Sequence, residues 1–450
     1  MKKTFYLLLI LGNIIHSQTQ FTIKGNFPQA SNKDIFIKGF TMSGDTLLAK
    51  TTADFSGNFI VNYPSSYSGA ALVEIKDIKS VIVLLKQENF DIQWDNFEEF
   101  KTLVFKNSPE NDAFSKGIAI AQSAERLLSG LNYLKPIYDQ EQNKSKAKWI
   151  NAEITLNKKA FPEFLKSLPK NSYALYYLKL RKFLQDISIT KSKFIEYIPE
   201  HENEFKNMDF DSENLLHSGL YKELIDGYFL LMESNGTLEN VTIHVNSSTD
   251  SVLKSLEKHP ELKQDVAEYL FRLFEKKSLF QAAEHLALAM LNNQSCGIDH
   301  KHEALFEQYR KMAKGKTAPD IVLENATKPV AKISDMKSKY KLVVFGASWC
   351  NKCVEEIPRL KTYYEDWKTK YDLEIVFISL DTERLNFNAF VKDFPWLSSC
   401  ELKGWESKAA IDYCVFGTPT MYLLDENNTI LVKPISDKQV QAWLEMNAKS

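Results

Sequence analysis

A chain of 450 residues with 44% hydrophobic and 25% charged residues has the composition of a soluble globular protein, and its length suggests two to four domains. The formal net charge of −2 excludes a general electrostatic attraction to nucleic acid or to an anionic membrane. Five cysteines are too few for a scaffold held together by disulfides.

The first 17 residues are predicted to be a secretory signal peptide. Lys2 and Lys3 precede an apolar run from Phe5 to Ile15 that is too short to cross a bilayer. A buried N-terminal strand is the alternative. No cysteine lies near the expected cleavage site after Ser17, so we expect no lipid anchor, and no other stretch is apolar enough for a transmembrane helix. These features predict a protein exported to a bacterial periplasm.

Residues 18–109 are predicted to form an antiparallel β-sandwich domain. Short alternating stretches are separated by turn residues at even spacing, which is typical of a sandwich or a barrel. Asp34, Asp45 and Asp54 are interpreted as turn and strand-edge residues rather than metal ligands. The expected strands contain residues 21–24, 34–38, 59–63, 71–75, 81–85, 91–94 and 103–105.

Residues 110–313 change to a helical pattern and are predicted to form an α-helical domain. Apolar residues recur every three or four positions, with lysine and glutamate on the intervening faces. One bundle core or an array of helical pairs fits this pattern. The tyrosines and phenylalanines at helical spacing are interpreted as core residues rather than a ligand groove.

The segment from Ala313 to Asp320 is the best candidate for a linker, because it combines a charge run, a glycine and a proline. Residues 314–450 are predicted to form an α/β domain that mixes parallel βαβ units with a closing hairpin. The expected order is strand 321–323, strand 341–346, helix 351–370, strand 373–380, helices 383–393 and 404–412, strands 420–424 and 429–433, and helix 436–447.

Two cysteines at a spacing of three, Cys350 and Cys353, follow a buried-strand pattern and begin a helical one. The first turn of a helix presents unpaired N–H groups and the positive end of the dipole, so the pKa of Cys350 is expected to lie below the free value near ~8.5. Cys353, one turn later, is expected to be more buried. The pair can close a disulfide and reopen it, with Cys350 attacking and Cys353 resolving the mixed disulfide.

A second motif, Gly417–Thr420, leads into another apolar strand. With Thr317–Asp320, Ala347–Cys350, Cys353–Pro358 and Ile375–Asp381, it makes the chain similar to the TlpA/ResA type of exported protein in the thioredoxin superfamily. The resemblance covers residues 316–450, about a third of the chain, and implies the thioredoxin fold. The preceding strands resemble a small β domain of unknown function that often accompanies such domains.

The resemblance assigns roles to several residues. It implies that the Thr418–Pro419 peptide is cis and lies against the Cys350–Cys353 disulfide, with the backbone of Thr418 free to pair with an extended substrate. It implies that Glu356 handles protons near the disulfide. Two departures leave the redox potential open. Val344 replaces the acid of ordinary thioredoxins, and Asn351-Lys352 replaces Gly-Pro between the cysteines.

Other residues near the motif keep two or more interpretations. Trp349 packs over the disulfide or docks a partner. Lys352 favours the Cys350 thiolate or is simply a solvated helix residue, and we favour the second interpretation. Cys400 and Cys414 are interpreted first as buried thiols, with a structural disulfide or a second exchange site as alternatives. Cys296, in a loop of the helical region, is interpreted as a lone thiol.

A CxxC pair is also half of a zinc site, but zinc needs four ligands. The other cysteines do not form a second CxxC, and no histidine follows His302. We therefore predict redox chemistry, with no metal and no cofactor.

The predicted function is an exported thiol–disulfide oxidoreductase, working in the reducing direction as the resemblance suggests. Expected partners are protein disulfides or dithiols and a membrane electron donor, but no nucleic acid. The resemblance alone suggests a connection with cytochrome c maturation, and the oligomeric state stays open. The alternative is a binding module that uses the thioredoxin fold and the first two domains as a scaffold. A peroxidase is not supported, because Ala347 stands where that chemistry wants a threonine.

Overall fold

The computed structural model describes residues 20–42, 44–140, 143–193, 195–234, 236–277, 279–292 and 300–448. The chain divides into two compact units, residues 1–235 and 236–450. The predicted signal peptide and Cys296 lie outside the described residues. No helix within the described ranges is long and apolar enough to cross a membrane.

The first unit begins with a β-sandwich. One sheet has the strand order β4-β1-β7-β8 and the other β3-β2-β5-β6. Inward side chains of both sheets, such as Ile23, Val61, Ile37 and Val73, form one hydrophobic core, which is why the two sheets stack. The strands are β1 (Gln20–Asn26), β2 (Asp34–Phe40), β3 (Asp45–Thr52), β4 (Asn58–Pro64), β5 (Gly69–Ile75), β6 (Lys79–Leu85), β7 (Phe90–Trp94) and β8 (Leu103–Lys106).

Two details of the sandwich differ from the sequence prediction. β1 pairs with β7 in parallel, so the sandwich is not wholly antiparallel. β3 was not among the predicted strands, because it is an edge strand without a buried face and its sequence lacks the alternation of apolar residues.

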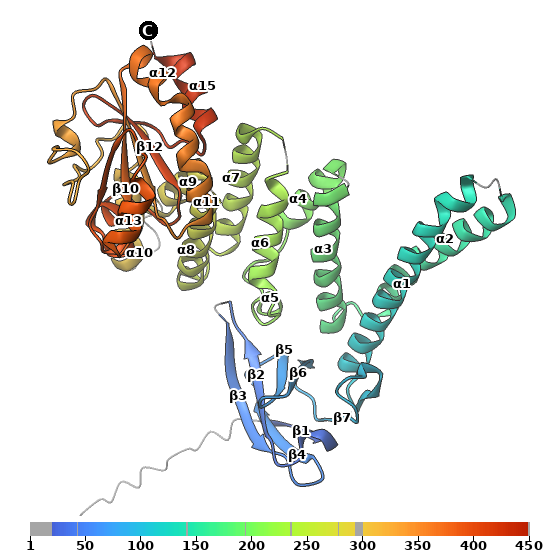
Figure 1. The fold of residues 1–450 in the computed structure, drawn as a ribbon. Helices are drawn as coiled ribbons and strands as arrows, with labels where there is room; N and C mark the ends of the chain where they lie inside the picture. Colours follow the sequence, from blue (N-terminus) through green and yellow to red (C-terminus); the bar gives the residue numbers. More distant parts are fainter. Residues whose placement is uncertain are drawn as a thin grey trace, which may run out of the picture. The chain divides into compact units, whose positions relative to one another are not determined.

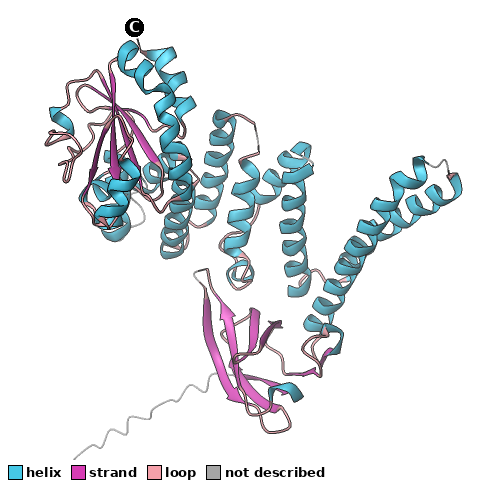
Figure 2. Ribbon diagram, in the orientation of Figure 1, coloured by secondary structure: helices cyan, strands magenta, loops and turns pink. Residues whose placement is uncertain are grey.

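Helices complete the first unit (Figure 2). The two longest, α1 and α2, form an antiparallel hairpin (Figure 1). The base of α1 packs against α3, where the rings of Phe114 and Tyr177 meet edge to face at 5.4 Å. The helices are α1 (Pro109–Gln140), α2 (Lys144–Ser167), α3 (Tyr173–Lys193), α4 (Ile198–Lys206), α5 (Glu213–Leu216) and α6 (Tyr221–Met232).

The second unit combines four helices with a five-stranded sheet. The helices are α7 (Leu238–Ser255), α8 (Pro260–Lys276), α9 (Phe280–Asn292) and α10 (His300–Lys311). The sheet has the order β11-β10-β9-β12-β13, with β9, β10 and β11 parallel and the β12–β13 hairpin antiparallel. Its strands are β9 (Tyr340–Gly346), β10 (Leu373–Ser379), β11 (Leu397–Cys400), β12 (Thr420–Asp425) and β13 (Ile430–Val432).

The remaining helices of the second unit connect these strands. They are α11 (Asn351–Glu356), α12 (Lys361–Tyr371), α13 (Arg384–Val391), α14 (Lys408–Asp412) and α15 (Asp437–Asn447). The single helix predicted over 351–370 is divided by a 3-10 turn, Ile357–Leu360, because Pro358 cannot donate a helical hydrogen bond. β11 was missed, since Leu397–Cys400 contains two serines, and the predicted strand 321–323 is only an isolated bridge at Val322.

The division between the two compact units falls at residue 235, inside the segment predicted to be helical. Helices α7–α10 fall in the same unit as the C-terminal sheet. Phe271 of α8 packs edge to face on Tyr309 of α10 at 4.7 Å and on Phe416 of the α/β segment at 5.5 Å. The predicted boundaries at 17, 109 and 313 stay predictions.

Candidate active site

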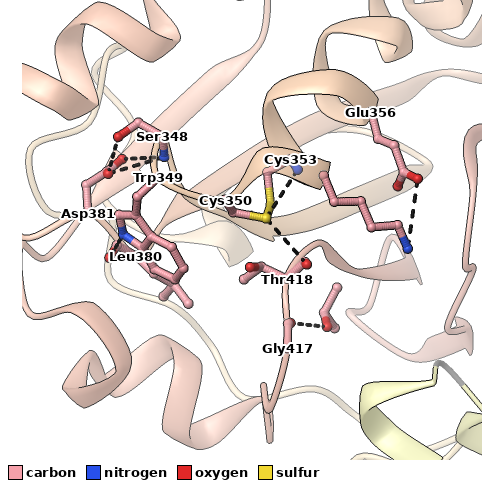
Figure 3. Close-up of a disulfide and its surroundings, with 11 residues drawn as sticks. Ser348, Trp349, Cys350, Cys353, Glu356, Leu380, Asp381, Gly417 and Thr418 are labelled. Carbon is pink, nitrogen blue, oxygen red and sulfur yellow. Dashed lines mark hydrogen bonds and ion pairs between the residues drawn. A yellow bond between two sulfur atoms is a disulfide. The ribbon is translucent and has the colours of Figure 1, made fainter.

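Cys350 and Cys353 lie where β9 ends and α11 begins, and they form a disulfide (Figure 3). Cys350 is the N-cap of α11, and its Sγ accepts a hydrogen bond of 3.2 Å from the backbone N–H of Cys353. A backbone N–H aimed at this sulfur stabilises negative charge on it once the disulfide is opened. The predicted junction of strand and helix is therefore present.

The two sulfur-bearing side chains differ in exposure. Cys350 is half-buried, whereas Cys353 is completely buried in the domain core. Only the first can be reached by a large disulfide partner.

Gly346 allows the helix to approach the strand closely. A Cβ at this position would lie 2.5 Å from Cδ1 of Ile357 and 3.4 Å from Sγ of Cys353. A side chain here would push the cysteine-bearing helix away from the sheet, so the glycine that interrupts the apolar run has a packing reason.

The Gly417–Thr420 loop lies beside the disulfide. The Thr418–Pro419 peptide is cis, as the resemblance implied. The carbonyl oxygen of Thr418 is 3.5 Å from Sγ of Cys350, and the hydroxyl of Thr420 donates to the carbonyl of Gly417 at 2.8 Å. The structure thus brings Thr418 and Pro419 to the reactive sulfur, at the start of β12.

Asp381 is a site residue to which the sequence analysis gave no role of its own. Its buried carboxylate accepts hydrogen bonds from the Ser348 hydroxyl at 2.6 Å and from the Ser348 backbone N–H at 3.2 Å (Figure 3). It also accepts a hydrogen bond from the Ser379 hydroxyl at 2.6 Å. Ser348 precedes Cys350 by two residues, so Asp381 positions the cysteine loop. An acidic residue just after a predicted parallel strand, at the edge where Cys350 also lies, was the available signal.

Trp349 lies on the surface next to the disulfide. Its side chain is 52% exposed, and its indole N–H donates to the carbonyl of Leu380 at 3.4 Å. Its ring lies 6.0 Å from that of Trp405, which is also exposed and which the sequence analysis did not single out. Two exposed indoles beside a reactive sulfur offer an apolar surface to a partner.

Glu356 ends α11 and forms an ion pair with Lys352, with 3.8 Å between Nζ and Oε1. Its other oxygen, Oε2, is buried without a hydrogen-bond partner among the residues that the structure describes. A buried carboxylate oxygen of this kind is available to hold or pass a proton.

The structure also shows the surroundings of Val344, Cys400 and Cys414, which the sequence analysis discussed. Val344 is completely buried in the core, so no ionisable group occupies that position. Cys400 and Cys414 are both free and buried, which confirms the first interpretation. Burial raises the pKa of the Cys414 thiol to about 12 and also raises the pKa of Cys400.

Helix α8 of the second unit contacts the residue that directly precedes the cis-proline loop. Phe416, directly before Gly417, packs against Phe271, and the guanidinium carbon of Arg272 lies 5.8 Å from the centre of its ring. Sequence periodicity identifies helix α8 but cannot show which loop it touches.

A family model described as thioredoxin-like matches residues 338–430, which include both cysteines and the cis-proline loop. The thiol-disulfide oxidoreductase ResA of Bacillus cereus is 26% identical over 148 residues, covering 32% of this chain and 84% of that protein. The thioredoxin-like protein YneN of Bacillus subtilis is 27% identical over 153 residues, covering 32% and 88%.

Solved structures are also similar to this chain. A thioredoxin-like protein from Bacteroides caccae is 18% identical and covers 54% of this chain and 90% of its own, with a TM-score of 0.39. The C-terminal domain of a putative thiol-disulfide oxidoreductase from Bacteroides thetaiotaomicron is 26% identical and covers 30% and 96%, with a TM-score of 0.28. The matched family model and the site geometry agree that residues 338–430 belong to a thioredoxin-like domain, and the curated relatives show that the C-terminal part of the chain is similar to thiol-disulfide oxidoreductases of the ResA type.

Proposed function

We propose that this protein is an exported thiol–disulfide oxidoreductase that reduces disulfides in client proteins. The observation that carries the proposal is the arrangement of the two sulfurs. Cys350 is accessible and caps a helix beside the cis-proline loop, and Cys353 is buried one turn behind it. The relatives named thiol-disulfide oxidoreductases support this reaction class.

The chemistry follows from this asymmetry. In the reduced protein the Cys350 thiolate attacks a client disulfide, which forms a mixed disulfide and releases one client thiolate. The Cys353 thiolate then attacks Sγ of Cys350, which releases the second client thiolate and leaves the internal disulfide seen here. Two electrons have moved to the client, and an external dithiol must return them.

The neighbouring residues are assigned supporting roles. Glu356 takes the proton from Cys353 as that sulfur becomes the nucleophile, and returns it when the disulfide is reduced. The backbone at Thr418, next to Pro419, pairs with an extended client segment, as exposed strand edges do. Trp349 covers an apolar side chain next to the client cysteine.

The cellular setting is part of the proposal. The charged and apolar pattern of residues 1–17 supports export to the periplasm, where a dithiol needs a membrane-linked electron donor to stay reduced. The 18–109 sandwich domain and the 110–313 helical domain select or hold the client. In the alternative, a scaffold function, these domains bind a partner and the cysteines are not needed.

The test is disulfide reduction by the purified protein with dithiothreitol as electron source. Wild-type protein is expected to reduce insulin, Cys350→Ser to be inactive, and Cys353→Ser to accumulate a mixed disulfide with its client, because the resolving thiol is absent. Cys414→Ser, which removes a buried thiol away from the exchange path, serves as the matched control. Full activity of Cys350→Ser would exclude the proposed chemistry. Partner capture that survives loss of both active-site thiols would favour the scaffold.

A further inference from the structure

The α1–α2 hairpin exposes an apolar flank. Its inner seam is filled by Ala124, Leu131 and Ile150, which are buried. Large apolar side chains outside this seam are nevertheless exposed to solvent: Leu127 at 50%, Tyr133 at 73%, Leu134 at 37%, Ile137 at 39%, Trp149 at 58% and Leu156 at 64%. This is the densest group of exposed large apolar residues on any helix pair within the described ranges.

All of these residues except Tyr133 follow one stripe on each helix. On α1 the stripe is residues 120, 123, 127, 130, 134 and 137, and on α2 it is residues 146, 149, 153, 156, 160 and 163, each spaced by three and four positions. Stripe positions 123, 130 and 149 directly precede the buried seam residues Ala124, Leu131 and Ile150, and the other stripe positions repeat this spacing. In an antiparallel helix pair, the residues that directly precede the seam residues lie on the same flank of both helices. The two stripes therefore form one surface.

The register of the hairpin supports this assignment. The ammonium group of Lys146 on α2 lies 4.7 Å from the ring centre of Tyr138 on α1, so these two residues lie at the same level of the hairpin, with the turn between them in the sequence. Leu127 then lies level with Leu156, and Leu134 lies level with Trp149.

We propose that this flank binds the same flank of a second copy of the chain, with the two hairpins antiparallel about a two-fold axis that crosses them near residue 154 of α2. On α1 this arrangement brings two large residues opposite small ones, because Leu127 faces Gly130 of the other copy and Leu134 faces Ser123, while Ile137 faces Ile120. A Cβ added at Gly130 would meet nothing within 4 Å, so the space beside it is open.

In the same register, the α2 helices of the two copies also present complementary residues to each other. Trp149 faces Ala160 of the other copy, and Lys146 near the turn faces Glu163 near the base, which gives two symmetry-related ion pairs. Both charged residues are exposed in the single chain. Charge complementarity with itself selects a second copy over an unrelated apolar partner. Glu153 faces Leu156 of the other copy in this register, and the two Glu153 side chains repel each other near the axis, so both pairings moderate the affinity.

The experiment measures the oligomeric state of the full chain by sedimentation velocity over a range of concentrations. A dimer is expected. Lys146→Glu is expected to weaken it about tenfold, because two attractions become repulsions, and Glu163→Lys is expected to do the same. The double variant Lys146→Glu/Glu163→Lys restores the dimer. These residues are too far apart to pair within one helix, so rescue identifies contact between copies.

Matched controls separate this flank from the opposite one. Leu156→Glu is expected to abolish the dimer, whereas Thr155→Glu and Lys148→Glu on the opposite flank leave it intact. Glu153→Gln is expected to tighten it. All of these side chains except Glu153 are largely exposed, so the variants retain the wild-type circular dichroism spectrum. A wild-type monomer at every concentration, or a dimer unaffected by Leu156→Glu, would overturn the proposal, and neither result depends on the oxidoreductase activity.

Discussion

Asp381 shows how one buried side chain controls the cysteine loop. It accepts three hydrogen bonds from Ser348 and Ser379, and the backbone carbonyl of the same residue accepts from the Cys400 thiol at 3.3 Å. Asp381→Asn replaces one acceptor oxygen with a donor that faces other donors. We expect a loss of about 1–3 kcal/mol of stability and a slower exchange reaction.

The measurement for Asp381→Asn is a denaturant titration together with the rate of disulfide reduction. Ser379→Ala removes one of the same hydrogen bonds without touching the loop and is the comparison. It should lower stability without slowing exchange. Equal effects of the two variants on the rate of disulfide reduction would show that Asp381 does not position the cysteine loop.

The buried thiols are expected to be unreactive in the folded protein. With its pKa raised to about 12, Cys414 carries roughly a thousandfold less thiolate than a free cysteine at about pH 8. After mild reduction, iodoacetamide should therefore label Cys350 first and leave Cys400 and Cys414 unlabelled, as read by peptide mass spectrometry. Rapid labelling of Cys414 would contradict the burial seen here.

The same pKa shift has a consequence for stability. Because folding keeps the Cys414 thiol protonated, its contribution is full below about pH 8.5 and is lost progressively as the pH rises toward 12. Cys414→Ala is therefore expected to flatten the alkaline end of the stability profile.

At the scale of elements, a buried ion pair joins α8 to the sheet. Lys433 follows β13, and its Nζ lies 3.7 Å from Oε1 of Glu275 and 3.2 Å from the hydroxyl of Tyr309. Burial raises the pKa of Glu275 and lowers that of Lys433, while each opposite charge counteracts the shift. A buried charge is tolerated here because its partner is also buried.

Removing one member of this ion pair should lower the free energy of unfolding more than removing both members. Lys433→Met is expected to cost about 3–5 kcal/mol by leaving Glu275 unpaired, and Lys433→Met/Glu275→Gln is expected to recover most of that loss. Urea titrations measure the free energy of unfolding of each variant in this double-mutant cycle. The exposed pair Arg359–Glu355 is the control, where Arg359→Ala should change stability by less than about 1 kcal/mol. Additive effects at Lys433 and Glu275 would rule out their coupling.

At the scale of the whole molecule, the thioredoxin-like sheet and helices α7–α10 share one compact unit. A fragment of residues 314–450 would expose Phe416 and leave Lys433 without Glu275 and Tyr309. We expect a fragment of residues 236–450 to melt near the full-length second unit, and the shorter fragment to melt roughly 10 °C lower. Calorimetry of both fragments tests this, and equal melting temperatures would show that the helices add nothing.

Local patterns in the amino-acid sequence were sufficient to place Cys350 and Cys353 where a strand ends and a helix begins. The run of apolar residues into Cys350, the spacing to Cys353 and the Gly417–Thr420 motif are all local signals, and each reflects backbone geometry within a few residues. The alternating strands of the sandwich and the helical periodicity of the middle segment are local in the same sense. Edge strand β3 and the short β11 were missed because neither has a strong apolar pattern.

Tertiary structure alone decided the contacts between distant segments. The sequence places Asp381 just after a strand, but it does not show that this carboxylate binds Ser348. Nothing in the sequence shows that Phe271 would pack against Phe416 or that β1 would pair in parallel with β7. The exposed flank of the α1–α2 hairpin also required coordinates, because periodicity marks apolar residues without showing which of them find a partner. Local propensity is set by neighbours in the chain, whereas these contacts depend on which surfaces meet once the chain has folded.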